Sequence, residues 1–544
     1  MEKTHPKLEL LANEYLREQC VVFPLVSTYY GLTEYYGFLT YPTKQRIESF
    51  IAFLKNLSKQ TESISGEKNE MERIDQEVFK YVLDLEIFGL EHPPYEASNV
   101  NPAELILNGV QTILDLPTLT DKEKHDLVLS RLNQGQELFE TLRPTWEKAT
   151  LLGLEDAVPM AQNLQGTLEF MLKALTEHTP QAKQATSDLA AALGKEGKSF
   201  AQWLEGEVKP KTSLACYVLG KEAYARLLEI RKEGHTWTER LQMGEQSLEC
   251  STKNLRALAL HLSPENGSLE AALSRVRSDL PTVPVMEEAR NAHKKVADFL
   301  KEKQLLHVPE AELLIEEPPK WNPFWGEGMM GLTLAESLGD RPSLRIIIPP
   351  PQTEKGKREL NRSAILLGVS HEGAAGHFGS YALRKERGNV IRMLPSPATG
   401  IDDGWTFYWE QLLREEGIQP THEYSFHQEY RVFWCSLRHI CDIKLHCGLV
   451  TFEECVKLLE QEGKVPPIMA KVYAKAIARM PGYFSSFITG KQHLTRLREY
   501  TKEQLAAHYS PLLFHKWIGE AGSIPYTLLE REIRQRVRTQ QGQG

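Results

Sequence analysis

The sequence predicts a mainly α-helical protein, a large multi-helix body with a small β-sheet beside the helices of its second half. Across the first 300 or so residues, apolar side chains recur at three- and four-residue intervals, the period of an amphipathic helix. Helix-starting residues such as Asp121 and Ser268 precede several of these segments. A single β-branched run, Leu344 to Ile348, is closed by three prolines and has the composition of a strand. With 544 residues, the chain can bury a large core.

The predicted helices of the first half follow one another with little irregular chain between them. Pro281 and Pro284 mark the gap before the last one. The polar residues 60–70 fit either a loop or the start of the next helix. The helical segments span 8–19, 45–59, 69–90, 120–150, 157–176, 184–206, 218–244, 246–262, 268–278 and 285–304.

The character of the sequence changes near residue 305, where prolines and glycines cluster before the strand at 344–348. The prolines that follow this strand indicate an edge strand or the end of a sheet. Helices resume from about residue 361. We therefore predict an N-terminal helical region, 1–305, and a C-terminal region, 306–544, either as two units or as one continuous fold.

Composition limits the partners and the location. A net charge of −9 without a long basic run argues against nucleic acid as the main partner. Apolar runs are too short to span a bilayer and the N-terminus lacks an apolar signal region, so no membrane partner is expected. The seven cysteines include no CxxC pair, which indicates free thiols and a cytoplasmic protein.

The run from Ser370 to His377 carries the strongest chemical pattern, because it holds two histidines with Glu372 beside the first. Imidazole and carboxylate are the usual protein ligands of Zn²⁺. His371 and His377 are six residues apart, so an ideal helix would hold them about 120° apart around its axis. They can share a metal only where Gly373 and Gly376 let the backbone depart from a helix. The alternative is a glycine-rich helix start with two ordinary polar histidines.

A second group follows at Asp403 and Glu410, seven residues apart and therefore on nearly the same face of a helix. Glu410 is a candidate third metal ligand because it comes from a separate helix. A solvated or ion-paired glutamate is the alternative.

A third group, Arg438, Asp442 and His446, forms a stripe with four-residue spacing on one helix. The stripe fits a surface row of ion pairs. It equally fits a buried network in which Asp442 orients Arg438 and His446 toward a substrate carboxylate or a developing oxyanion.

These blocks, in this order, resemble the bacterial family known as domain of unknown function 885. That family has His-Glu-x-x-Pro-Gly-His and then Glu-Gly-Trp-Ala-Leu-Tyr-x-Glu, where this chain has residues 371–377 and 403–410. Further blocks fit at residues 203–210, 219–224, 438–455, 480–490 and 514–529. The similarity thus extends over roughly residues 90–530.

The resemblance implies a gluzincin-type zinc peptidase with a neurolysin-like deep cleft between helical lobes. It implies one Zn²⁺ per chain and a general base at Glu372. Substrate or transition-state contacts would come from Arg438 and His446, positioned by Asp442. The implied metal ligands are His371, His377 and Glu410.

Three positions depart from the family pattern. Ala375 replaces the motif proline, Asp403 replaces the first glutamate of the second block, and Phe487 replaces a tyrosine. Where that tyrosine stabilises an oxyanion, Tyr483 or His446 would have to substitute for it.

The leading expectation is a zinc-dependent peptidase that acts on short peptides through metal-activated water. One alternative is a metal-dependent amidase or esterase that acts on a non-peptide compound. The others are a catalytically silent helical binding protein and a scaffold for protein contacts.

Overall fold

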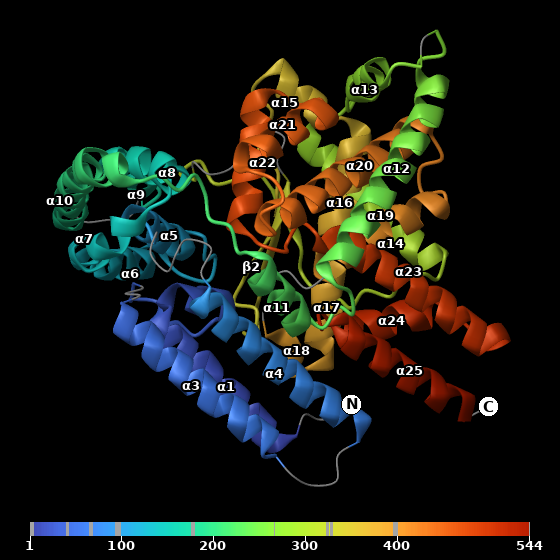
Figure 1. The fold of residues 1–544 in the computed structure, drawn as a ribbon, viewed down its shortest axis with the longest axis horizontal. Helices are drawn as coiled ribbons and strands as arrows, with labels where there is room; N and C mark the ends of the chain where they lie inside the picture. Colours follow the sequence, from blue (N-terminus) through green and yellow to red (C-terminus); the bar gives the residue numbers. More distant parts are fainter. Residues whose placement is uncertain are drawn as a thin grey trace.

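Helices build most of the fold, and the computed structural model in Figure 1 shows them arranged around one small sheet. The structure describes residues 5–39, 43–64, 69–92, 100–175, 180–265, 267–322, 326, 330–394 and 401–542. The predicted class, mainly α with a small sheet, is confirmed.

Three long N-terminal helices lie side by side at the lower left of Figure 1. They are α1 (Pro6–Val22), α3 (Lys44–Glu62) and α4 (Glu70–Glu91), with the short α2 (Ser27–Tyr30) after α1. Asn69 and Glu72 form a capping box that starts α4. Of the segment 60–70, residues 65–68 lie outside the described residues.

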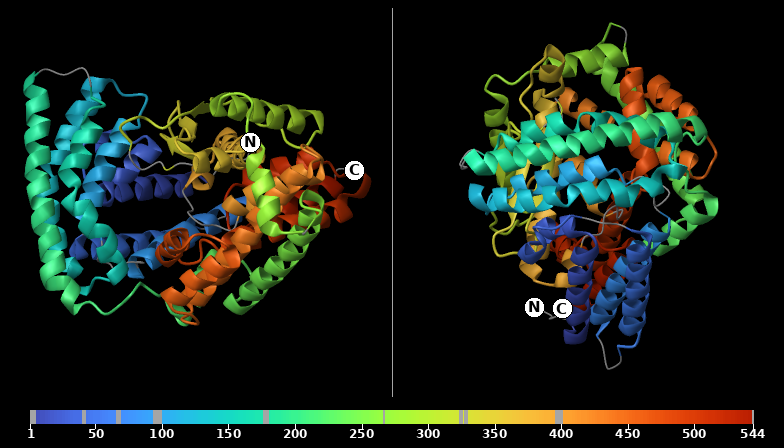
Figure 2. Two further views of the ribbon diagram at one scale, coloured as in Figure 1. Left: turned by 90° about the horizontal axis from the view of Figure 1, so that it is seen from above. Right: turned by 90° about the vertical axis from the view of Figure 1, so that its left-hand side faces the viewer.

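A second group of helices surrounds a hydrophobic core of its own and stands to one side of the remaining molecule in the left view of Figure 2. Two predictions were wrong here, because 120–150 and 157–176 each contain a break, near Gln134 and at Asn163. The first helix of the group was not predicted. The group comprises α5 (Pro102–Leu114), α6 (Asp121–Asn133), α7 (Gly135–Leu142), α8 (Leu151–Gln162), α9 (Leu164–Leu172) and α10 (Pro180–Trp203).

The bounds predicted for the helices that follow were also wrong. Segments 218–244 and 246–262 are instead α11 (Lys221–Arg231) and an uninterrupted α12 (Trp237–Leu262). Thr236 and Glu239 form the capping box that starts α12, and this local hydrogen bonding sets the boundary earlier than the apolar pattern suggested. The next helices are α13 (Leu269–Ser278) and α14 (Val285–Glu302).

The sheet contains β1 (Leu314–Glu316), β2 (Gly331–Ala335) and β3 (Ser343–Ile347) in the order β1-β3-β2. The strand predicted at 344–348 is therefore present, but it is the central strand and not an edge strand. The prolines follow β3 and so remove no hydrogen bond from its ladder. β3 pairs with β1 in parallel and with β2 antiparallel, which leaves β2 at an edge.

The C-terminal helices form the large body at the right of Figure 1. The largest hydrophobic core joins α1, α3 and α4 to α14, α16, α19 and α25, so packing crosses residue 305. α19 and α23 approach closely, because a Cβ on Gly404 would lie 2.5 Å from the Cα of Gly490. The helices are α15 (Glu354–Glu359), α16 (Arg362–Glu372), α17 (His377–Arg387), α18 (Val390–Met393), α19 (Asp402–Glu415), α20 (His422–His446), α21 (Phe452–Gly463), α22 (Pro467–Arg479), α23 (Ser486–Leu505), α24 (Pro511–Ala521) and α25 (Tyr526–Gly542).

Among the described residues, no helix is both long enough and apolar enough to cross a membrane. All seven cysteines are free thiols, and Cys250 is the exposed one.

Candidate metal centre

A break between two helices brings the two motif histidines together. α16 ends at Glu372 and α17 begins at His377, so His371 and His377 belong to different helices. A Cβ on Gly376 would collide with the carbonyl oxygen of His371, and one on Gly373 would lie 2.5 Å from the carbonyl oxygen of Val369. The two glycines are therefore needed for close backbone approach.

Backbone bonds and one tryptophan hold this break in place without the motif proline. The N–H groups of Gly376 and Gly379 both donate to the carbonyl of Gly373, at 3.0 and 3.3 Å. The indole Nε1 of Trp405 donates to the carbonyl of Gly376 at 3.2 Å. Ala375 is fully buried where the family has proline. These contacts fix the turn that the proline would otherwise restrain.

His371, His377 and Asp403 form the cluster suited to a metal ion. One ligand atom from each lies within 4.8 Å of those of the other two, and no other such group occurs among the described residues. Asp403 Oδ1 lies 3.8 Å from His371 Nε2 and 3.6 Å from His377 Nε2. His371 and Asp403 are buried.

The donor set and its spacing fit Zn²⁺. Two ligand atoms of one tetrahedral zinc lie roughly 3.4 Å apart, since Zn–N and Zn–O bonds are about 2.1 Å long. Both measured separations lie within a few tenths of an ångström of that value. Two imidazoles and one carboxylate leave a fourth position open, as catalytic zinc sites do.

Glu410 lies on the other nitrogen of His371. Its Oε1 is 2.8 Å from His371 Nδ1, and its two oxygens accept hydrogen bonds from Arg431 at 2.8 and 3.1 Å. With Nδ1–H donated to this carboxylate, the lone pair of Nε2 faces Asp403 and His377. The structure thus places Glu410 against Nδ1 of His371, and Asp403 lies beside Nε2 of the same ring.

Neighbouring positive groups keep the carboxylates of Glu410 and Asp403 ionised. Burial by itself would raise the pKa of Glu410, but Arg431 and then His371 bring it below the ordinary value. Burial would likewise raise the pKa of Asp403, and His377 lowers it. Burial would lower the pKa of His377, but Asp403, together with the charges of Asp402 and Glu372, raises it to about 10.

Glu372 stands beside the cluster and is held by the sheet. Its Oε1 lies 4.0 Å from His371 Nε2, and its Oε2 accepts a hydrogen bond of 3.0 Å from the backbone N–H of Leu332. Leu332 belongs to the edge strand β2, so the sheet orients this carboxylate. A carboxylate in this position can accept the proton of a water held at the cluster.

Tyr483 reaches the cluster from the turn before α23. Its hydroxyl is hydrogen-bonded to Asp403, and burial together with Asp403 raises its pKa, so the phenol stays neutral. Asp442 holds this turn by accepting hydrogen bonds of 2.8 Å from the N–H groups of Gly482 and Ser485.

The members of the Arg438–Asp442–His446 stripe have separate partners. Arg438 donates to Cys435 Sγ at 2.7 Å and lies over the rings of Phe484 and Phe487. His446 is fully buried, with Nε2 hydrogen-bonded to the carbonyl of Ile477 at 2.9 Å. This hydrogen bond links α20 to α22. His446 does not belong to the cluster of His371, His377 and Asp403.

Arg431 is the site residue that sequence reasoning missed. It lies seven residues before Arg438, so the same stripe continued two turns toward the N-terminus would have included it. Its guanidinium also lies 5.6 Å from the ring centre of Phe407.

Comparison with known proteins places the chain among proteins of undescribed activity. Residues 24–533 match the model of a family described as "Bacterial protein of unknown function (DUF885)". None of the curated proteins compared with the chain matches it.

Two solved structures share the fold over nearly their whole lengths. One is "a putative lipoprotein of unknown function from Shewanella oneidensis", with TM-score 0.79, 16% identity, and coverage of 96% of this chain and 99% of that chain. The other is "the putative lipoprotein from Colwellia psychrerythraea", with TM-score 0.80, 15% identity, and coverage of 98% and 99%.

Proposed function

The chain belongs to the DUF885 family of bacterial proteins of unknown function, and we propose that it is a zinc-dependent hydrolase that cleaves amide bonds in short peptides. The observation that carries this proposal is the convergence of His371, His377 and Asp403, with Glu372 beside them. Zinc held there would supply Lewis acidity for attack of water on a carbonyl carbon.

Two residues beside the cluster would contribute to the hydrolysis. Glu372, held through Oε2 by the edge of the sheet, is free at Oε1 to take the proton of the attacking water and return it to the leaving amine. Tyr483 is a neutral hydroxyl that donates to Asp403, and it would have to turn from Asp403 to the substrate to give the hydrogen bond that Phe487 cannot.

Arg438 supports a peptide substrate with a free carboxyl end. Its side chain is half-buried, and no carboxylate among the described residues lies within ion-pair distance of it. The ring of Phe487 packs edge to face against Phe407, which in turn contacts the ring of His371. The guanidinium of Arg438, beside these aromatic rings, suits the free carboxylate of a peptide that extends from the cluster.

The proposal carries two further expectations from the sequence. One is the gluzincin-like deep cleft between helical lobes, which would restrict substrates to short peptides. The other is a cytoplasmic location, and fractionation of cells that express the untagged chain would test it against the lipoproteins that share its fold.

The test is hydrolysis of a panel of short peptides by zinc-loaded protein and by Glu372→Gln, with zinc content measured for both. We expect cleavage by the wild type and a loss of kcat on the order of 10²–10⁴-fold in the variant, with zinc retained. Zinc-loaded wild type that turns over no peptide would contradict the peptidase proposal. Turnover of simple amides or esters would then favour the non-peptide alternative.

A further inference from the structure

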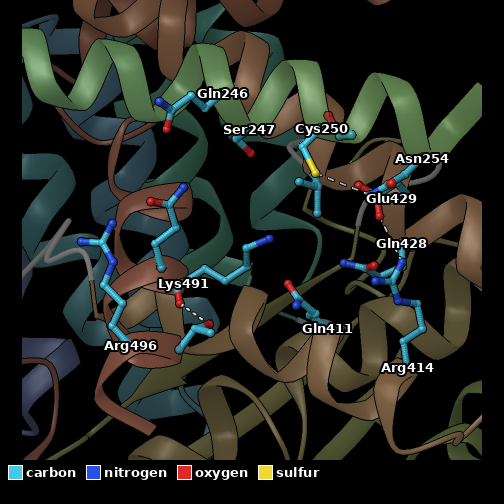
Figure 3. A pocket seen from close by; sticks show the side chains of 14 residues that line it. Gln246, Ser247, Cys250, Asn254, Gln411, Arg414, Gln428, Glu429, Lys491 and Arg496 are labelled. Carbon is cyan, nitrogen blue, oxygen red and sulfur yellow. Dashed lines mark hydrogen bonds and ion pairs between the residues drawn. The ribbon is translucent and has the colours of Figure 1, made fainter. Parts of the chain in front are cut away.

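A polar cavity lies between four helices of the C-terminal body. It has a volume of about 430 Å³ and is walled by α12, α19, α20 and α23. Figure 3 shows its lining side chains from close by. None of them belongs to the metal cluster. Serine, cysteine and amide side chains of α12 form one wall.

Positive charge dominates the lining. Glu429 is the sole carboxylate of the lining and is bound by Arg414 at 3.0 Å. That pair leaves Lys491 and Arg496, and neither has an ion-pair partner among the described residues. The cavity therefore carries a net positive charge.

Lys491 points into the open space, as Figure 3 shows. Lys491 is half-buried, and burial lowers the pKa of its amino group, an effect that Glu429 offsets only in part. An ammonium group with little hydration and no bound carboxylate is costly. A ligand anion would remove this cost.

Gln428 gives a second, independent indication of a ligand. Gln428 is 1% exposed, and neither its amide nitrogen nor its amide oxygen has a hydrogen-bond partner among the residues that the structure describes. A buried amide without partners loses the hydrogen bonds that it makes in water. Because Gln428 also lines the cavity, a turn of its side chain would bring this amide to a polar ligand.

We propose that this cavity binds a small anion that carries a carboxylate or phosphate group. Lys491 and Arg496 would neutralise the charged group, and Gln428 would donate to and accept from the ligand. The volume is that of a small-molecule site.

The site would connect elements that also build the metal centre. α19 provides both Asp403 and the cavity residues Gln411 and Arg414. Lys491 follows Gly490, the residue against which Gly404 of α19 packs. The inference nevertheless stands without the metal, since no ligand of the proposed zinc takes part in it.

The test is the shift in thermal unfolding temperature produced by inorganic phosphate and by malonate, each against potassium chloride at equal ionic strength. The full chain is measured as purified and again after dialysis against EDTA, so that anion binding at a metal is distinguished from binding in the cavity. We expect both anions, or one of them, to raise the unfolding temperature in both preparations. A rise by one anion alone identifies the preferred group.

Lys491→Met is the matched variant, with Lys502→Met on the same helix as its control. Lys502 lies outside the cavity and pairs with Glu499 at 3.1 Å. We expect affinity to fall on the order of tenfold or more in Lys491→Met and to stay unchanged in Lys502→Met. An equal shift in wild type and Lys491→Met, or no shift beyond potassium chloride in the wild type, would overturn the proposal.

Amine footprinting tests the wild type without relying on a variant that folds. An amine-reactive reagent followed by mass spectrometry reports the labelling of each lysine. We expect phosphate or malonate to protect Lys491 and to leave Lys502 labelled as before. Unchanged labelling of Lys491 at an anion concentration that saturates the thermal shift would place binding elsewhere and reject the cavity.

Discussion

The carboxylate of Glu410 lies 2.8 Å from Nδ1 of His371, while Nε2 of the same ring lies 3.8 Å from Asp403. A carboxylate on one nitrogen fixes the tautomer of the ring and strengthens the other nitrogen as a metal ligand. We therefore propose that Asp403 would bind the metal and that Glu410 would orient His371.

Glu410→Gln should weaken zinc binding without abolishing it. The amide oxygen can still accept from Nδ1–H, but the negative charge that strengthens His371 is lost, so we expect affinity to fall about 10–100-fold. Asp403→Ala removes a ligand and should cost more. Competition with a chromogenic chelator measures all three proteins.

Glu415→Gln is the control for this comparison, because Glu415 lies on the same helix, is exposed, and accepts from Gln411. Its affinity for zinc should equal that of the wild type. Complete loss of zinc in Glu410→Gln, with retention in Asp403→Ala, would instead make Glu410 the third ligand.

Zinc binding should release a proton from His377. In the metal-free protein, burial lowers and Asp403 raises the pKa of His377, with a result of about 10, so its imidazole is protonated at pH 7. A ligand imidazole must be neutral. Affinity should therefore increase with pH up to about 10, and calorimetry in two buffers of different ionisation enthalpy counts the released proton. An equal heat in both buffers at pH 7 would contradict the expected release.

Arg438→Met should discriminate between two forms of one peptide. The guanidinium is expected to bind a substrate carboxylate, so kcat/KM should fall roughly 10–100-fold for a peptide with a free carboxyl end. The same peptide with an amidated end lacks this contact and is the matched control. Equal losses for both forms would show that Arg438 only supports the packing of Phe484 and Phe487.

Acid should weaken the attachment of the C-terminal helix through Glu532. This buried carboxylate contacts Arg392 at 2.9 Å, Arg387 at 3.3 Å and Arg536 at 2.7 Å. Burial would raise its pKa, but the three arginines lower it from 4.5 to about 2. The stabilisation is therefore present above about pH 4.5 and is lost as the pH falls toward 2.

Glu532→Gln should lower the free energy of unfolding at pH 7 by about 3–5 kcal/mol, because it leaves buried guanidinium groups without this partner. In the variant, the free energy of unfolding measured in urea should also vary less with pH between pH 2 and pH 7. Glu530→Gln, which removes a surface pair with Arg534, should change stability by less than about 1 kcal/mol. A Glu532→Gln effect as small as that of Glu530→Gln would contradict the expected burial of this charge.

Periodicity predicted the elements that bury one regular face. The helices at α3, α13 and α14 and the strand β3 were found in this way. β1 was missed because three residues show no alternation, and its pairing with β3 joins chain segments some thirty residues apart. Tertiary pairing of this kind leaves little trace in local sequence.

The candidate site was predictable as a set of residues but not as an arrangement. Spacing put Asp403 and Glu410 on one helix face, and the structure places them at opposite nitrogens of His371. Two carboxylates two turns apart can reach the two sides of one ring, so spacing alone cannot decide which of them faces the metal. Arg431 became a site residue only through the packing of α20 against α19.

The measurement that tests the central claim most directly is metal content per chain, for wild type and His377→Ala purified without chelator or metal-affinity resin. We expect about one zinc per wild-type chain and the loss of this zinc in the variant. Wild-type protein that binds no zinc, even after incubation with it, would contradict the metal centre and leave a helical binding protein.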